Sequence, residues 1–161
     1  MEKIPMTPKG FQALMDELRQ LKDVERPKVI AEIAEARGHG DLKENAEYHA
    51  AREKQGFIEG RIQELETVIS RVDVIDHTKF EGDTVRFGAT VEVYDEDGDK
   101  TLCYMIVGHY EADITKNRLS LQAPLSRALI GKAVGEVVAV AAPGGQKSYE
   151  IVSVKYLEHA A

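Results

Sequence analysis

The sequence predicts an α+β protein, in which an antiparallel two-helix coiled coil is followed by a β-sheet domain with one short helix. Three observations carry this prediction. Residues 8–75 have the apolar period of a helix, and residues from about 83 onward alternate with a period of two. The third observation is a glycine pair, Gly38 and Gly40. This pair breaks the helical part once and divides it into two helices joined by a tight turn.

The helical part has the pattern of a coiled-coil hairpin. Thr7 and Pro8 have the character of a helix start, and good helix formers dominate the residues that follow. Each helix would contain about 30 residues, so the hairpin would be about 45 Å long. Apolar positions recur at spacings of three and four, with a phase shift near Pro27. The expected seam consists of Leu14, Leu18, Leu21, Ile30, Ile33, Arg37, Ile58, Ile62, Leu65, Ile69 and Val72.

The second part has the pattern of a compact sheet. Residues 89–94 alternate, a turn follows at Asp97-Gly98, and residues 101–107 return as a partner strand. Residues 124–130 predict a short helix with Pro124 in its first turn. Two further strands, 136–141 and 148–157, flank a Pro-Gly-Gly turn that begins at Pro143. We therefore predict a hairpin over residues 1–76, with its acidic tip at 38–44, and a globular domain over residues 77–161.

Composition excludes several classes of protein. No apolar run approaches the roughly 20 residues of a membrane helix, and the N-terminal residues lack the pattern of a signal peptide. The single cysteine, Cys103, excludes an internal disulfide and is expected to be a small core residue in a reducing cytoplasm. The net charge is −7, and both halves are negative. Because a protein that holds nucleic acid by itself needs a basic surface, we expect another protein to place this one.

The tip of the hairpin carries the candidate site. Asp41 and Glu44 lie three residues apart at the expected start of the second helix, so they share one turn. Asp-x-x-Glu at a helix start is a capping box, in which both carboxylates bind free amide groups. The same carboxylates could face outward and offer oxygen ligands to Mg²⁺ or position a water molecule. Spacing leaves both roles open. Arg37, Lys43 and Arg52 supply positive charge near by, although spacing alone favours solvated residues in weak ion pairs as their explanation.

Longer matches indicate a family. Residues 41–53, DLKENAEYHAARE, with IAEAR at 33–37 and HGD at 39–41, resemble the tip signature of the Gre transcription elongation factors. Further matches extend over nearly the whole chain: IPMTPKG at 4–10, FGATVEV at 87–93, IVG at 106–108, RALIGK at 127–132 and PGG at 143–145.

This resemblance implies a fold and a partner. It implies an N-terminal antiparallel coiled coil and a C-terminal FKBP-like domain that docks on RNA polymerase beside its secondary channel. The coiled coil would thread the channel, and the polymerase would then hydrolyse its own backtracked RNA. The factor itself would be a cytoplasmic monomer, would not be an enzyme, and would bind no cofactor alone.

The resemblance also implies roles for particular residues. Asp41 and Glu44 would help to hold the second Mg²⁺ of the polymerase active centre and the attacking water. Arg37 and Arg52 would lie near the 3′ end of the nascent RNA. The docking surface would include Pro124, Leu125, Ser126 and Arg127. The family's docking helix usually begins Ser-Pro-Ile-Ala, so Ala123 replaces a serine cap worth about 1 kcal/mol.

Two alternatives remain at this point. A protein of the same shape could bind the secondary channel and regulate or inhibit the polymerase without stimulating cleavage, although the presence of both Asp41 and Glu44 favours cleavage. The FKBP-like fold alone would suggest a peptidyl-prolyl isomerase. Fold does not carry activity, and the spacing of the few aromatic residues in the second half indicates no clear apolar proline pocket.

Overall fold

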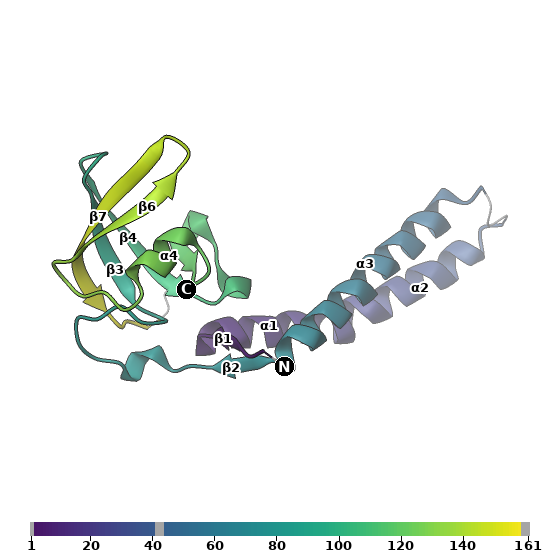
Figure 1. Cartoon of the computed structure of the whole chain (residues 1–161). Coiled ribbons are helices and arrows are strands. Elements are labelled where there is room, and N and C mark those ends of the chain that lie inside the picture. Colours follow the sequence, from purple (N-terminus) through teal and green to yellow (C-terminus); the bar gives the residue numbers. More distant parts are fainter. Residues whose placement is uncertain (1, 41–43, 159–161) are drawn as a thin grey trace. The chain divides into compact units, whose positions relative to one another are not determined.

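The computed structural model describes residues 2–40 and 44–158 (Figure 1). Contacts divide the chain into two compact units. The first consists of Met1–Glu2 and Phe11–Val72, and the second of Lys3–Gly10 and Asp73–Ala161. The segment Lys3–Gly10 thus belongs with the second unit, a placement that the sequence did not predict. Within the described residues, no helix combines the length and the apolar character needed to cross a membrane.

The first unit is a helical hairpin. Its first arm consists of α1 (Pro8–Gln20), a π-helical turn (Leu21–Glu25) and α2 (Arg26–Arg37). The second arm is α3 (Ala46–Ile69). Figure 1 shows α2 and α3 running side by side, which confirms the predicted antiparallel pair. The predicted restart of the helix at Asp41 is wrong, because α3 begins at Ala46.

The apolar seam follows the π-helical turn. Leu14 is buried, and Leu18 and Leu21 are partly buried against the cluster formed by Val29, Ile58 and Ile62. The 4-3 rhythm of the three leucines would continue at positions 25, 28, 32 and 35, but the buried residues of α2 each come one position later, at Val29, Ile33 and Ala36.

A π turn explains this shift, because it holds one more residue than an α turn. The Arg26 N–H donates to the carbonyl of Leu21, five residues back, and Pro27 has no N–H to donate. The expectation that Ile30 and Arg37 lie in the seam is therefore wrong. Ile30 is 52% exposed and Arg37 is exposed.

Ion pairs border the seam on both flanks. They join Lys22 to Glu66 at 3.0 Å, Arg26 to Glu59 at 2.8 Å, Arg61 to Glu17 at 2.7 Å and Lys54 to Glu32 at 3.6 Å. The hydrogen bond from Arg26 lowers the pKa of the Glu59 carboxyl. Exposed pairs of this kind contribute little stability individually. Together these ion pairs favour one register of the two arms, since each pair can form in only one alignment of the helices.

The second unit contains a five-stranded sheet in the order β5-β4-β3-β7-β6. All neighbouring strands are antiparallel except β4 and β5. A separate two-stranded sheet pairs β1 (Ile4–Met6) with β2 (Val72–Val74). The strands of the larger sheet are β3 (Thr90–Asp95), β4 (Lys100–Val107), β5 (Arg118–Ser120), β6 (Val137–Ala142) and β7 (Gly145–Lys155).

The core of the second unit lies between this sheet and the short helix α4 (Pro124–Leu129), which contributes the fully buried Leu129. The other buried members of the cluster are Val85, Ala89, Val91, Val93, Ile106, Val138 and Ile151. The predicted α+β fold, with a helical hairpin, a sheet and one short α-helix, is confirmed.

Two expectations for loops and strands have different outcomes. The acidic segment after β3 is a hairpin turn, as predicted. The Asp95 carboxylate accepts from the N–H groups of Gly98 at 3.0 Å and Asp97 at 3.1 Å, and the Gly98 bond is the main cause that lowers the pKa of Asp95. The expectation that Cys103 is buried is wrong, because it lies on the exposed first half of β4, opposite Glu92.

Two neighbouring isoleucines test the shifted seam. Ile33 is 7% exposed and Ile30 is 52% exposed on the same helix. Ile33→Ala should lower the free energy of unfolding of the hairpin by about 2–5 kcal/mol. The matched change Ile30→Ala should alter it by no more than about 0.5 kcal/mol. Urea unfolding followed by far-UV circular dichroism measures both free energies. Equal destabilisation by the two variants would show that the seam does not distinguish Ile33 from Ile30.

Candidate functional site

The tip of the hairpin connects the end of α2 at Arg37 to the start of α3 at Ala46. Two hydrogen bonds close the last turn of α2, from the Gly38 N–H to the Glu35 carbonyl and from the His39 N–H to the Ala36 carbonyl, both at 3.1 Å. Gly40 has a φ of +121°, a backbone conformation that favours glycine. Asp41, one of the two predicted tip acids, and the neighbouring Lys43 lie outside the described residues.

Asn45 organises the two helix ends. Its side-chain carbonyl Oδ1 accepts from the Tyr48 N–H at 3.0 Å, which caps the start of α3. Its Nδ2 donates to the Ala36 carbonyl at 2.6 Å, which satisfies an acceptor at the end of α2. One amide side chain therefore fastens both arms together at the tip. The predicted position of Glu44 in the first turn of α3 is wrong, since the cap of α3 is Asn45. The cap expected of Asp41 falls outside the described residues.

Glu44 is consequently left outside the helix that it was expected to cap. Its side chain is exposed, and within the described part of the chain it makes no hydrogen bond or ion pair. It lines an open hollow of about 390 Å³ together with His39, Asn45, Ala46 and Glu47. Glu47, by contrast, has a partner, because its Oε2 lies 3.6 Å from Nδ1 of His39. Glu44 is thus the described tip carboxylate that can turn toward an external group.

The two predicted basic residues occupy different levels of the hairpin. Arg37 lies at the tip, with its guanidinium carbon 5.9 Å from the centre of the Tyr48 ring, a cation–π contact that holds the charge in place. Arg52 lies six residues into α3, about 9 Å along the helix from Ala46. It is exposed and donates to Gln55 at 3.2 Å. Arg37 therefore lies at the tip, as the last residue of α2, whereas Arg52 lies further down the second arm.

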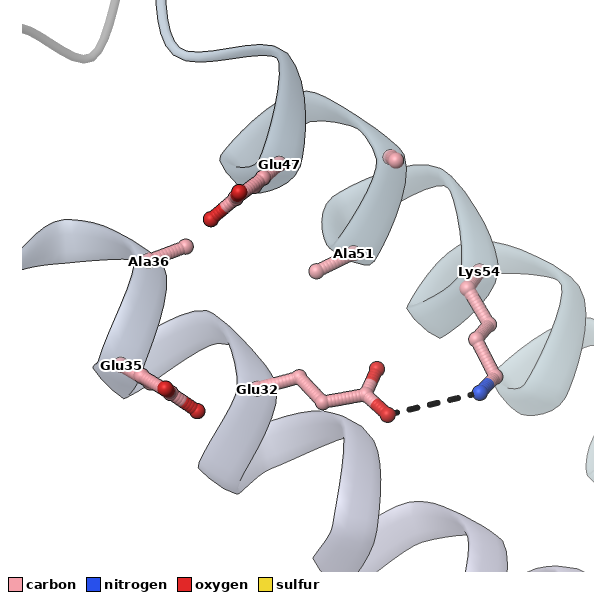
Figure 2. Close-up of a pocket in the computed structure, with 7 residues that line it drawn as sticks. Glu32, Glu35, Ala36, Glu47, Ala51 and Lys54 are labelled. Carbon is pink, nitrogen blue, oxygen red and sulfur yellow. Dashed lines mark ion pairs between the residues drawn. The ribbon is translucent and has the colours of Figure 1, made fainter. Parts of the chain in front are cut away.

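A second hollow, of about 370 Å³, lies between the arms just below the tip. Figure 2 shows Glu32 and Glu35 on one helix and Glu47 on the other around this space, with Lys54 paired to Glu32. The small side chains of Ala36 and Ala51 leave it open. Sequence reasoning missed this hollow, for which the only signal was alanine at seam positions.

These acids do not form a metal centre. Within residues 2–40 and 44–158, no three His, Cys, Asp or Glu side chains come close enough to hold a metal ion. Each carboxylate at the described tip offers one or two oxygen ligands of the kind that Mg²⁺ prefers.

The predicted docking residues divide into exposed and buried members. Pro124 and Arg127 of α4 are exposed, and Leu125 is partly buried against the core of the second unit. Ser126 is fully buried, so it does not belong to the outer surface on which it was expected. Ala123 precedes α4 without a side-chain cap, in agreement with the missing serine.

Comparisons with known proteins agree over both units. A family model described as "Transcription elongation factor, N-terminal" matches residues 4–74, and one described as "Transcription elongation factor, GreA/GreB, C-term" matches residues 79–156. The transcription elongation factor GreA of Caulobacter vibrioides is 62% identical over 157 residues, which cover 98% of this chain and 100% of that protein.

Two other relatives show the same degree of likeness. GreA of Rhodospirillum rubrum is 60% identical over 156 residues, covering 97% of this chain and 99% of that protein. GreA of Rickettsia conorii is 58% identical over 156 residues, with 97% and 96% covered. These matches extend through the tip, the sheet and the short helix described above. The chain belongs to the GreA/GreB family of transcription elongation factors.

Proposed function

We propose that this protein stimulates RNA polymerase to hydrolyse its own backtracked nascent RNA, and so returns arrested complexes to elongation. The observation that carries the proposal is the exposed Glu44 carboxylate at the end of a long two-helix hairpin, released from helix capping by Asn45. A narrow hairpin with a free acid at its end suits a protein that reaches into an enclosed active centre. The polymerase performs the chemistry, and this protein acts as its cofactor and not as an enzyme.

The residues at the tip fit a shared Mg²⁺ ion. Glu44, together with Asp41, would supply carboxylate oxygens, the ligands that Mg²⁺ prefers. When bound, Mg²⁺ supplies the positive charge that activates a water molecule for hydrolysis. The carboxylates hold and orient that water, and their contribution is largest if the polymerase leaves the second metal position only weakly occupied.

The basic residues fit a role beside the RNA. Arg37, the last residue of α2, lies over the Tyr48 ring at the tip, where its guanidinium could meet a phosphate of the RNA 3′ end. Arg52 lies further along α3 and would meet a phosphate more distant from the reacting bond. The protein carries a net charge of −7, so protein contacts, and not phosphate attraction, should place it on the polymerase.

Docking is assigned to the globular unit. Pro124 and Arg127 form the exposed side of α4, while Ser126 and Leu129 face inward. We propose that Pro124 and Arg127, with the accessible part of Leu125, contact RNA polymerase, and that Ser126 supports them from beneath. The protein would act as a monomer in the cytoplasm, where its polymerase works.

Charge removal at the tip tests the cleavage proposal. Glu44→Gln and Asp41→Asn keep the shape of each side chain but remove its charge. Each should lower the rate of RNA cleavage in a backtracked complex by roughly 10- to 100-fold at saturating protein, since one carboxylate ligand is lost. Affinity for polymerase should stay unchanged. The measurement is release of the 3′ RNA fragment from stalled complexes.

Glu47→Gln is the matched control, because Glu47 is a neighbouring tip acid that is paired with His39. It should cleave like the wild type. If the wild type binds polymerase but releases no RNA, the protein is a channel-binding regulator and the cleavage proposal is wrong. If Glu44→Gln and Asp41→Asn both cleave at the wild-type rate, the carboxylates are not the ligands.

Charge reversal on α4 tests the docking surface. Arg127→Glu should weaken binding to polymerase by about tenfold, as expected for an interface contact worth about 1.4 kcal/mol. Thermal unfolding should change little, because Arg127 is exposed. Lys155→Glu, an exposed change in β7, is the control and should bind normally. Equal losses in both variants would indicate a general charge effect, and normal binding by Arg127→Glu would place the docking surface elsewhere.

A further inference from the structure

One carboxylate in the second unit binds two segments that are distant in sequence. Glu111 ends the 3-10 helix His109–Glu111, which follows β4. Its Oε2 accepts from the Gly108 N–H and from the Thr7 N–H, each at 2.9 Å, and its Oε1 accepts from the Thr7 hydroxyl. Thr7 precedes Glu111 by 104 residues. We call this set of bonds the Thr7–Glu111 clasp.

The clasp replaces a missing part of a capping box. Thr7 lies directly before α1, and its Oγ1 accepts from the Gly10 N–H at 3.1 Å, as an N-cap does. In a capping box the residue three positions later is Glu or Gln, which binds the N–H of the cap. Here that position is Gly10, and the acid that binds the Thr7 N–H is Glu111. The acid of the box therefore comes from the body of the globular unit.

Two glycines make room for this arrangement. A Cβ atom on Gly10 would lie 2.0 Å from Oε1 of Glu111, so a larger residue there would displace the carboxylate. A Cβ atom on Gly108 would lie 2.3 Å from the Pro5 carbonyl oxygen, so a larger residue there would push away the strand before Thr7. Neither glycine has a positive φ, which means that close approach and not backbone conformation requires them.

The clasp acts where the chain leaves the globular unit. The chain passes into the hairpin between Gly10 and Phe11 and returns between Val72 and Asp73. The two crossing segments are paired with each other, since β1 lies beside β2 and the Ile75 N–H donates to the Met6 carbonyl at 2.9 Å. The Thr7–Glu111 clasp ties the outgoing segment to the 3-10 helix after β4. The negative carboxylate also lies at the positive end of α1, which strengthens its bonds.

We propose that Glu111 is a positioning residue for RNA cleavage, which seats the first turn of α1 on the globular unit so that the docked unit holds the hairpin steady. This inference rests on the proposed function. Loss of the carboxylate should leave the docking surface on α4 and the tip acids intact. It should reduce how often the tip occupies the active centre of a bound polymerase, and therefore lower the cleavage rate without lowering affinity.

Two variants separate this role from simple helix capping. Glu111→Ala removes the clasp. Adding Gly10→Glu to it restores an acid at the third position of α1, which can now cap Thr7 locally because the carboxyl group at position 111 is gone and only its Cβ atom remains, 3.1 Å from the new Cβ. The double variant thus recovers the cap but not the connection to the 3-10 helix. Full-length protein is used throughout, with cleavage rate at saturation and polymerase affinity measured separately on backtracked complexes.

We expect Glu111→Ala to bind polymerase like the wild type and to cleave at least about fivefold more slowly at saturation, because misplacement of a reacting group is costly. The double variant should recover thermal stability but not the cleavage rate. Wild-type cleavage by Glu111→Ala, or rescue of cleavage by the double variant, would overturn the positioning role.

Hydrogen exchange at the Thr7 and Gly108 amides gives a readout that does not depend on cleavage. Both N–H groups donate to Glu111, so both should exchange faster in Glu111→Ala while the amides of β3 and β7 keep their protection. In the double variant the Thr7 amide should regain protection and the Gly108 amide should not. Unchanged exchange in Glu111→Ala would overturn the clasp itself. If the wild type stimulates no cleavage, the positioning role falls with the proposed function, and the exchange data still decide whether the clasp exists.

Discussion

A pair of helices has only one stripe on each arm to bury, and the hairpin depends on that single seam. Its central apolar cluster consists of Val29, Ile58 and Ile62, which meet across the interface of the two arms. The flanking ion pairs add little energy but fix the alignment of the arms. Toward the tip, Ala36 and Ala51 replace the larger side chains. Hydrophobic contact between the arms therefore decreases toward the tip, where hydrogen bonds join the two helices instead.

Asn45 supplies those bonds. By capping α3 and binding the last turn of α2 at once, it closes the tip with a neutral side chain. A carboxylate could also have capped α3, and would have gained from the helix dipole. Capping by an amide leaves Glu44 outside the helix, with its charge available. The amide thus makes the structural bonds between the two helix ends, and the neighbouring carboxylate stays available for the role proposed above.

Most of the architecture could be predicted from the period of the apolar residues and from the residues typical of turns. The predictions that were wrong failed for physical reasons. Val29 and Ile30 are both apolar neighbours, so hydrophobicity alone could not choose the seam, and the π turn made the choice. Asp41 and Asn45 are both good N-cap residues, so the start of α3 was ambiguous. The clasp joins residues that are distant in sequence, and its only local sign was Gly10 at a position where a capping box has Glu. For the candidate site, residue types were predictable but exposure was not, as the burial of Ser126 illustrates.

The π turn at Leu21–Glu25 also bears on how this hairpin can change in length. It behaves as a single-residue insertion that the helix has absorbed in one wide turn. Deleting one residue there would bring Val29, Ile33 and Ala36 into the rhythm of the preceding leucines and allow an uninterrupted α-helix. A deletion within α2 or α3 cannot be accommodated in this way. It would rotate every later side chain by about 100° about the helix axis and turn the seam toward water. Tolerance of a single-residue deletion in the paired arms is therefore concentrated in this one turn, between the start of the first arm and its tip.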